Sequence, residues 1–311
     1  TLWERKASGP ADDSYRSLFT LYEAMNAPVD ASQVAAAHAA PTRPASSGRS
    51  RAGTRTFTFL GTGTSMGVPM LGCDCHVCTS TNPRNHRFRC SVLIGTPRGN
   101  ILIDTSPEMR LQLLRENVKL INAVVYTHYH VDHLFGLDDL RIFPLKLQGD
   151  LPVYCTEEVE GVIRQAFAYV FAPGSEEVPL GLLPRLDLRR ITEAPFEVLG
   201  ERFTPIPLIH GRFNVFGFRI GNVAYCTDVS AIPERSWPLL EGLDVFVVDA
   251  LRPGKPHPSH FSVEQALEAV ARVKPGRAYL THMAHTLEYD ELSRALPAGV
   301  EPAYDGLRFA F

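Results

Sequence analysis

A dense group of metal-binding side chains occurs where the chain reads Thr-His-Tyr-His-Val-Asp-His. His128, His130, Asp132 and His133 place three imidazoles and a carboxylate within six residues. The group directly follows the apolar run Ala-Val-Val-Tyr, which predicts a buried strand. A strand that ends in such a group delivers several ligands into one small volume, and these ligand types suit zinc, iron or manganese. The sequence therefore predicts a metal site at this strand end.

Three further residues of ligand type follow predicted strands later in the chain. An extended segment ends in His210, a short apolar run precedes Asp228, and the run Arg-Ala-Tyr-Leu-Thr precedes His282. Taken singly, an Asp after a strand is more often a turn or cap residue. All three share a position at a strand end, and the family resemblance described next implies that they belong to the same site.

Together these residues resemble the ligand pattern of the metallo-β-lactamase superfamily of metallohydrolases. The resemblance implies an α/β fold, a four-layer αββα sandwich whose strand-end loops hold two divalent metal ions. It also implies the ligand sets, which are His128, His130 and His210 for one metal, Asp132, His133 and His282 for the other, and Asp228 as the bridge. Mixed imidazole and carboxylate sites accept manganese, zinc or iron, so the sequence does not fix the two metals.

A second motif is formed by Cys73, Cys75 and Cys78, in a C-x-C-x2-C spacing. Three close thiols cannot all pair with one another in disulfides, but they can supply three ligands of a tetrahedral zinc site. The motif resembles that of the PhnP-like phosphodiesterases of the superfamily, in which a His three residues after the last active-site His completes a structural zinc site. The resemblance implies His285 as the fourth ligand, with His76 as the alternative; a metal-free thiol cluster is the other interpretation.

Two more segments resemble the superfamily. The glycine-rich stretch from Phe59 to Pro69 is similar to its opening strand and turn, where glycines let the backbone pass close to the metals. Asp104 follows another predicted strand, and it either orients a ligand imidazole or simply ends a turn.

The 311 residues divide into two parts of different character. Residues 1–55 include alanine- and proline-rich sequence and a serine, glycine and arginine linker, so we expect a disordered or linker extension. Residues 56–311 are expected to form one catalytic domain. Within it we expect helices at residues 110–119 and 262–273, the second begun by a capping box, and strands at residues 153–155 and 245–249.

Composition excludes several classes of protein. No window approaches the roughly 20 apolar residues that a membrane span needs, so we expect no membrane partner. The net charge of −3 does not favour a polyanionic partner. Clustered thiols of metal-ligand type and the lack of a recognisable secretory leader lead us to expect a cytoplasmic protein.

Two bridged metals lower the pKa of a bound water and neutralise charge on a phosphoryl oxygen, so a phosphodiester is a natural substrate. His260 stands just before the capped helix, and PhnP-like enzymes and tRNA 3′-processing endonucleases both carry a functional His in such a context. We therefore assign His260 as the proton donor to the leaving group, with His257 as the alternative. The metal ligand Asp132 is the second residue that we assign as catalytic.

The choice of substrate separates the family alternatives. Residues 156–200, where an RNA-binding arm is a candidate, carry eight acidic residues against four arginines and would repel a nucleic acid. We therefore expect hydrolysis of a small, cyclic phosphodiester rather than tRNA 3′ processing. A non-catalytic PqqB-like binding protein is the third alternative, although all seven catalytic-metal positions are filled. The sequence does not fix the oligomeric state, and a homodimer is one assembly that we consider.

Overall fold

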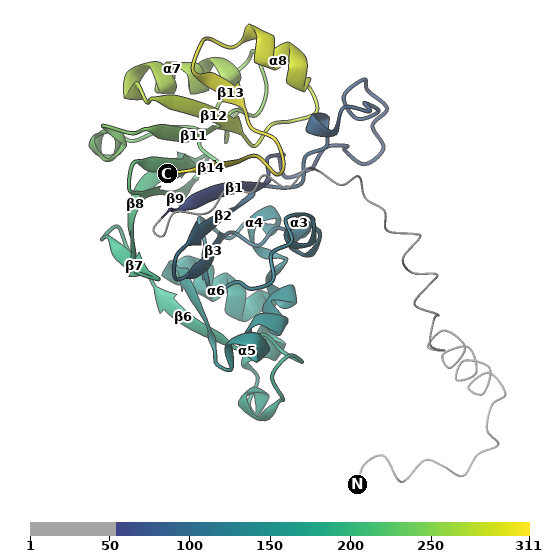
Figure 1. The fold of residues 1–311 in the computed structure, drawn as a ribbon, viewed down its shortest axis with the longest axis vertical. Coiled ribbons are helices and arrows are strands. Elements are labelled where there is room, and N and C mark those ends of the chain that lie inside the picture. The colour runs from purple at the N-terminus through teal and green to yellow at the C-terminus, as the bar shows by residue number, and fades with distance from the viewer. Residues whose placement is uncertain (1–53) are drawn as a thin grey trace, which may run out of the picture. The chain divides into compact units, whose positions relative to one another are not determined.

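The computed structural model describes residues 54–311, so all but the last two residues of the extension expected over residues 1–55 lie outside the described residues. Two seven-stranded sheets face each other, and helices cover their outer sides (Figure 1). The strand order is β14-β1-β2-β3-β4-β5-β6 in the first sheet and β13-β12-β11-β10-β9-β8-β7 in the second. This is the expected four-layer αββα sandwich.

The strands are short, and the first sheet takes its strands from both ends of the described region, whereas the second consists of consecutive strands. The first sheet consists of β1 (Thr56–Gly61), β2 (Ser91–Thr96), β3 (Gly99–Ile103), β4 (Ala123–Val125), β5 (Leu151–Cys155), β6 (Leu186–Arg190) and β14 (Arg308–Ala310). The second consists of β7 (Phe196–Val198), β8 (Glu201–His210), β9 (Phe213–Ile220), β10 (Val223–Cys226), β11 (Val245–Asp249), β12 (Arg277–Thr281) and β13 (Val300–Pro302).

The helices connect the strands. The α-helices are α3 (Met109–Arg115), α4 (Val131–Leu134), α5 (Ile142–Leu147), α6 (Glu157–Ala166), α7 (Val263–Val273) and α8 (Tyr289–Ala295). Short 3₁₀ segments lie at Pro83–Asn85, Leu137–Arg141, Ala168–Phe171, Ser175–Glu177 and Glu234–Leu240. None of the helices in residues 54–311 is long and apolar enough to cross a membrane.

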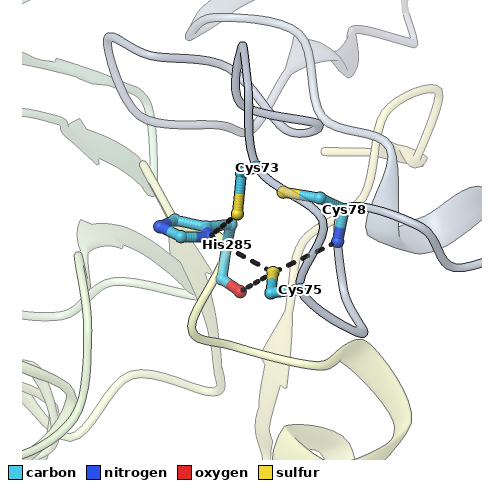
Figure 2. Close-up of side chains that lie close together, drawn as sticks. All are labelled: Cys73, Cys75, Cys78 and His285. Atoms are coloured by element: carbon cyan, nitrogen blue, oxygen red, sulfur yellow. Dashed lines mark hydrogen bonds between the residues drawn. The ribbon is translucent and has the colours of Figure 1, made fainter.

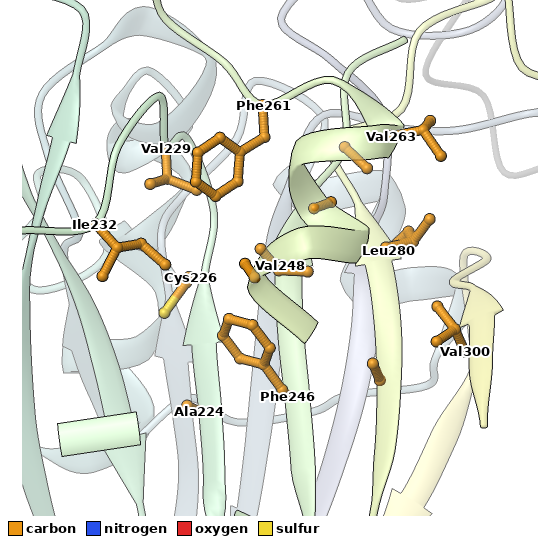
Figure 3. Packing of buried hydrophobic residues seen from close by; sticks show 14 of the residues in the cluster. Ala224, Cys226, Val229, Ile232, Phe246, Val248, Phe261, Val263, Leu280 and Val300 are labelled. Atoms are coloured by element: carbon orange, nitrogen blue, oxygen red, sulfur yellow. The ribbon is translucent and has the colours of Figure 1, made fainter. Parts of the chain in front are cut away.

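Alternating side chains on the strands fill the layers on both sides of each sheet. In β11, Val245 and Val247 pack between the sheets, whereas Phe246 and Val248 face the outer layer beneath α7. Figure 3 shows α7 over this outer layer, with Leu280 of the neighbouring strand beside them. Because successive side chains point to opposite faces, a strand that is covered on both sides reads as a continuous apolar run.

Parallel pairing brings several strand ends to one edge. In the first sheet β3, β4, β5 and β6 run parallel, and in the second β10, β11, β12 and β13 do so. The long strand β8 is antiparallel to β9, which is antiparallel to β10, so β8 and β10 point the same way. The loops after these carboxyl ends therefore lie where the predicted ligands occur.

The expected secondary structure is confirmed for three of the four segments. Residues 153–155 and 245–249 lie in β5 and β11, and residues 263–273 form α7 with Ser262 as its N-cap. The helix expected over residues 110–119 is wrong at its C-terminal end, because α3 stops at Arg115. The chain turns at Asn117, which adopts a positive φ of 55° and so cannot continue a right-handed helix.

The stability of α7 provides a test of its N-terminal cap. The Ser262 hydroxyl accepts a hydrogen bond from the Gln265 amide, and the Gln265 side chain accepts one from the Ser262 amide. Ser262→Ala removes one of these bonds and should lower the free energy of unfolding by about 1 kcal/mol in urea denaturation. Glu268→Ala, at an exposed position of the same helix, is the control and should change stability by less than about 0.5 kcal/mol. Equal effects of the two changes would contradict a capping role for Ser262.

Candidate metal centre

The carboxyl ends of β4, β8, β10 and β12 bring the predicted ligands together at one edge of the two sheets. The seven residues form what is called here the strand-end cluster, which consists of His128, His130, Asp132, His133, His210, Asp228 and His282. A backbone hydrogen bond of 3.2 Å from the Phe216 amide to the Thr127 carbonyl joins the two sheets beside it. Residues up to 154 positions apart in the sequence, from His128 to His282, therefore meet in one volume.

Three residues of this edge adopt a left-handed backbone conformation. They are Asp104, with φ of 65°, Asp228, with φ of 54°, and His282, with φ of 59°. Each follows a strand directly or after one residue, and each ends that strand with a sharp turn. Such a conformation costs a non-glycine residue about 1–2 kcal/mol, and strain of this kind concentrates at functional sites.

The first half of the cluster is a group of imidazoles. His130 Nδ1 lies 3.1 Å from His128 Nε2 and 3.2 Å from His210 Nε2. Two nitrogen ligands of a tetrahedral zinc ion are about 3.4 Å apart, given bonds of about 2.0–2.1 Å. Asp228 Oδ2 lies 3.9 Å from His128 Nε2 and 3.7 Å from His210 Nε2. The spacing therefore suits one shared cation.

The second half of the cluster shares Asp228 with the first. Asp228 Oδ1 lies 3.2 Å from His133 Nε2, and Asp228 Oδ2 lies 3.3 Å from His282 Nε2. Asp132 Oδ2 lies 3.3 Å from His133 Nε2 and 3.7 Å from His282 Nε2. The candidate ligand atoms of each half lie within 4.8 Å of one another, and Asp228 belongs to both halves. A carboxylate in that position can bridge two cations.

Several ligand atoms of the strand-end cluster are buried without hydrogen-bond partners, which indicates that they suit a cation. Asp132 Oδ2, His133 Nε2 and His282 Nε2 are buried and accept or donate no hydrogen bond. An unsatisfied buried polar atom costs about 1–3 kcal/mol, so three of them in one place need a common partner. Burial alone would raise the pKa of Asp228, but His282 and His133 lower it well below its usual range. The pKa of His128 is lowered well below its usual value because burial penalises its charged form.

Neighbouring groups fix the orientation of the imidazoles. His133 Nδ1 lies 2.8 Å from Asp104 Oδ2, and His210 Nδ1 lies 2.5 Å from the Ser259 carbonyl oxygen. His128 Nδ1 lies 2.9 Å from the Thr127 hydroxyl, which itself donates to Asp104. Each contact occupies one ring nitrogen and leaves Nε2 for a metal. Of the two interpretations of Asp104, the orientation of a ligand imidazole is the one that fits these contacts.

His260 lies beside the cluster but forms no part of either half. Its Nδ1 is 2.8 Å from Asp249 Oδ2, and its ring stacks on that of His282 with the centroids 4.5 Å apart. The ring of His210 is 4.6 Å away on another side. His257, the alternative proton donor, instead uses its Nδ1 to accept hydrogen bonds from Ser259. The structure therefore places His260 against ligands of both halves.

The three cysteines converge on His285 to form the cysteine cluster, Cys73, Cys75, Cys78 and His285 (Figure 2). The sulfur atoms of Cys73 and Cys75 each lie 3.3 Å from His285 Nδ1. The pKa of the Cys75 thiol is lowered to about 6, chiefly because the Cys78 amide donates to its sulfur and also because His285 adjoins it. His76, the alternative fourth ligand, is exposed and lies outside the cluster. Four ligand groups of this kind fit a tetrahedral zinc ion.

One short segment connects the two clusters. His282 and His285 are three residues apart, and Met283 between them is fully buried. The Met283 amide donates to the Thr62 carbonyl at 2.9 Å, and the Met283 carbonyl accepts from the Thr64 amide at 3.3 Å. The glycine-rich turn expected to pass near the metals therefore holds this segment in place.

Two contributors to the site were not assigned functions from the sequence. Asp249 is fully buried at the end of β11, and it accepts hydrogen bonds from the Val229 amide and from His260. The sequence feature that could have identified Asp249 is an acidic residue at the end of an apolar run, as for Asp228. Thr127 connects Asp104 to His128. Nothing in the sequence distinguishes this threonine from one that has no role in the site.

Comparison with known proteins agrees with this geometry. Residues 99–283 match the model of the beta-lactamase superfamily domain. The crystal structure of a diphosphatase from the PhnP family is 41% identical, with a TM-score of 0.77, and the match covers 83% of this chain and 97% of that one. Zinc-bound PqqB from Methylobacterium extorquens shares the fold at 18% identity, with a TM-score of 0.68 and coverage of 82% and 99%.

A protein named octanoyltransferase from Porphyromonas gingivalis is 36% identical over 252 residues, which is 80% of this chain. The chain spans only half the length of that protein. With the family model matched over more than half of its residues, this chain belongs to the metallo-β-lactamase superfamily. Within the superfamily it is similar to a PhnP-family member in sequence and fold.

Removal of the shared carboxylate tests whether the cluster is one bridged unit. Asp228→Ala should release both cations of the strand-end cluster, because each half loses a ligand, while the metal of the cysteine cluster stays bound. Metal content per chain can be measured by inductively coupled plasma mass spectrometry. Asp244→Ala, at an exposed position before β11, is the matched control and should keep the full metal content. A variant at position 228 that also kept it would exclude Asp228 as a bridge.

The cysteine cluster can be tested separately. Cys75→Ser replaces a thiolate ligand, so zinc content should fall by one ion per chain and the yield of folded protein should fall with it. The strand-end cluster should keep its cations in the protein that folds. Cys155→Ala is the control, since Cys155 is buried in the core away from both clusters. Unchanged zinc content and unfolding temperature in Cys75→Ser would mean that the cluster holds no structural metal.

Proposed function

We propose that this protein is a metal-dependent hydrolase that cleaves small phosphodiesters, with cyclic ones as the preferred class. The observation that carries the proposal is the shared position of Asp228 between two ligand groups, with His260 directly beside both. The arrangement supplies sites for two cations and, on the same side, a group that can donate a proton. Hydrolysis of a phosphodiester with an alkoxide leaving group can use both.

The two clusters offer different kinds of ligand atom, and each is therefore assigned its own metals. His128, His130 and His210 would hold one divalent cation, Asp132, His133 and His282 the other, and Asp228 would bridge them; both are manganese, zinc or iron in this proposal. Cys73, Cys75, Cys78 and His285 would hold a structural zinc. When bound, the bridged pair of cations supplies an activated water and neutralises charge on the phosphoryl group.

His260 donates the proton that the leaving alkoxide requires. Asp249 accepts a hydrogen bond from Nδ1 and so holds the ring with Nε2 free. The same carboxylate is anchored by the Val229 amide at 2.9 Å, so the pair is rigid. Asp249 is thus a positioning residue for His260.

The surroundings of the cluster favour a small substrate. A pocket of about 530 Å³ is lined by His128 and Tyr129 and also by three carboxylates, Glu157, Glu158 and Glu193. A polynucleotide threaded past these groups would meet repulsion at each phosphate. In residues 156–200, part of the chain forms the edge strands β6 and β7 of the two sheets. These features argue against a tRNA 3′-processing activity.

A second candidate is hydrolysis of a diphosphate. It is favoured by the 41% identical structure, which is described as a diphosphatase. The leaving group of a diphosphate is itself a phosphate, which departs without being protonated. A ribose oxygen leaves as an alkoxide and must receive a proton. The dependence of the rate on His260 therefore distinguishes the two candidates.

Acyl transfer, the activity named for the Porphyromonas gingivalis relative, is not the function that we propose. In residues 54–311 three of the six cysteines belong to the cysteine cluster, and Cys90, Cys155 and Cys226 are buried. Burial raises the pKa of Cys90 and of Cys155 to about 12, which makes them poor nucleophiles. The six free thiols also agree with the reducing cytoplasm that we propose as the location.

A substrate panel tests the proposal. Purified protein loaded with manganese or zinc should be assayed on bis-p-nitrophenyl phosphate, a 2′,3′-cyclic nucleotide, a nucleoside diphosphate, a precursor tRNA, a β-lactam and a thioester. We expect turnover of the first two substrates at the highest kcat/KM. Preference for the nucleoside diphosphate would favour the second candidate, and inactivity on all six by fully metal-loaded protein would favour a PqqB-like binding role.

His260→Ala should keep its metals but lose activity on the cyclic nucleotide by about 100- to 10,000-fold in kcat, because general acid catalysis typically contributes this much. The loss should be much smaller on bis-p-nitrophenyl phosphate, whose phenolate leaves without a proton. Steady-state kinetics on both substrates, with metal content measured in parallel, checks this.

His257→Ala is the matched control for that variant, since His257 is a nearby histidine whose ring faces Ser259. It should change kcat on the cyclic nucleotide less than about tenfold. Equal losses on the two substrates in His260→Ala would indicate that His260 binds phosphate instead. Loss of metal from the variant would make His260 a ligand, together with Asp249 and His282.

A further inference from the structure

The pocket beside the strand-end cluster is lined by residues of both sheets and combines aromatic with polar side chains. His128 and Tyr129 line it from the loop after β4, and Asn214 and Phe216 line it from β9 of the second sheet. Its volume of about 530 Å³ is typical of sites for small organic molecules, which measure about 300–1,000 Å³. Because His128 is also a candidate metal ligand, a molecule bound at the cations can extend into this pocket.

Tyr129 has a fixed orientation at the pocket. Its ring meets the ring of Phe213 edge-on, with the centroids 5.8 Å apart and an angle of 82° between the planes. Phe213 meets the ring of His130 in the same way, at 5.1 Å and 89°. Tyr129 also lies between the ligands His128 and His130 in the sequence, so the chain sets its distance from the cations. An aromatic ring held in this way can stack on a flat, aromatic part of a substrate.

One carboxylate of the pocket is free to accept hydrogen bonds. Glu157 pairs with Arg190 at 2.7 Å, and Glu193 pairs with Arg235 at 2.9 Å. Glu158 also lines the pocket, in the first turn of α6, and its side chain makes no ion pair or hydrogen bond in the described part of the chain. Carboxylates repel a phosphate, so a phosphodiester bound at the cations must direct its uncharged part toward this pocket.

Two further polar groups of the lining lack partners. Neither the Tyr129 hydroxyl nor the Asn214 side-chain amide forms a hydrogen bond with another described residue. An ionised carboxylate only accepts hydrogen bonds, whereas an amide and a phenol can also donate them. The pocket thus offers an acceptor at Glu158, donors at Asn214 and Tyr129, and an aromatic ring. This combination of groups fits a nucleobase.

Guanine is the base whose hydrogen-bonding groups match this set. Its N1–H and its N2 amino group are adjacent donors that one carboxylate can accept together, and the O6 carbonyl beside them can accept from an amide or a hydroxyl. The amino groups of adenine and cytosine adjoin a ring nitrogen that is itself an acceptor, and N3–H of uracil lies between two carbonyls. A carboxylate placed against those edges would face an acceptor and be repelled.

We propose that this pocket binds the base of a cyclic nucleotide and selects guanine, a proposal that rests on the phosphodiesterase activity proposed above. Tyr129 stacks on the base, Glu158 accepts from N1–H and the N2 amino group, and Asn214 donates to O6. The phosphodiester of the same molecule then lies at the strand-end cluster. These three residues determine specificity and take no part in the cleavage of the bond.

Steady-state kinetics test the choice of base on the 2′,3′-cyclic phosphates of guanosine, adenosine, cytidine and uridine. The metal-loaded wild type should prefer the guanosine substrate in kcat/KM by about tenfold or more, because a bidentate contact to a base discriminates by about this much. Glu158→Gln should reduce the preference to about threefold or less, since an amide accepts through one oxygen only. Glu177→Gln is the matched control and should keep the preference, because Glu177 is an exposed carboxylate that does not line the pocket.

The cyclic phosphate of methyl riboside, which lacks a base, tests the aromatic ring. Tyr129→Leu should lower kcat/KM on the guanosine substrate, relative to the methyl riboside substrate, by about 5- to 150-fold, which is the range for one base stacked on a ring. Tyr129→Phe keeps the ring and should keep this ratio within about threefold. Ratios between substrates are compared because they cancel any loss of folded or metal-loaded enzyme.

Product binding separates failure of this proposal from failure of the proposed function. In calorimetric titrations of metal-loaded protein, guanosine 3′-monophosphate should bind at least about tenfold more tightly than uridine 3′-monophosphate. This difference in a protein that hydrolyses no phosphodiester would support the pocket and reject the activity. An active protein that does not prefer the guanosine substrate, or equal binding of the two products, would overturn the guanine pocket.

Discussion

The arrangement of the two sheets around their strand ends depends on one interaction. A buried group of imidazoles and carboxylates requires positive charge, in the form of cations that its members share. Asp132, His133, Asp228 and His282 are almost completely inaccessible to water, and several of their ligand atoms have no hydrogen-bond partner. Such a group is unfavourable by itself, because burial without a partner costs each polar atom. Cations that bind these atoms would supply the missing partners and so offset the unfavourable free energy of burial. The two sheets then act as a frame that keeps the strand ends at the spacing the cations require.

Much of this centre could be predicted from the chain, because its ligands occur at strand ends in a dense pattern. His128, His130, Asp132 and His133 are local in sequence, so their proximity needs no knowledge of the fold. His210, Asp228 and His282 needed the superfamily resemblance to join them, since nothing in their separate surroundings relates one strand to another. The cysteine motif was similarly local, whereas the choice of His285 over His76 rested on the resemblance and on the gain from joining two distant loops through one site.

The rest depended on tertiary contacts that sequence patterns do not encode. Asp249 ends a buried strand as Asp228 does, yet only the folded chain shows that it holds His260. The end of α3 was missed because Asn117 turns the backbone to a positive φ, a conformation that its neighbours in sequence do not signal.

The short segment from His282 to His285 has a consequence for how the strand-end cluster responds to changes at the surface. Both histidines depend on the same backbone, which Thr62 and Thr64 hold on either side of Met283. Oxidation of the partly exposed thiols of Cys73 and Cys75 would change the groups that lie against His285. The segment would then hold His282, whose backbone adopts the left-handed conformation, less firmly. Oxidation near the surface would in this way affect His282, although that side chain is itself fully buried.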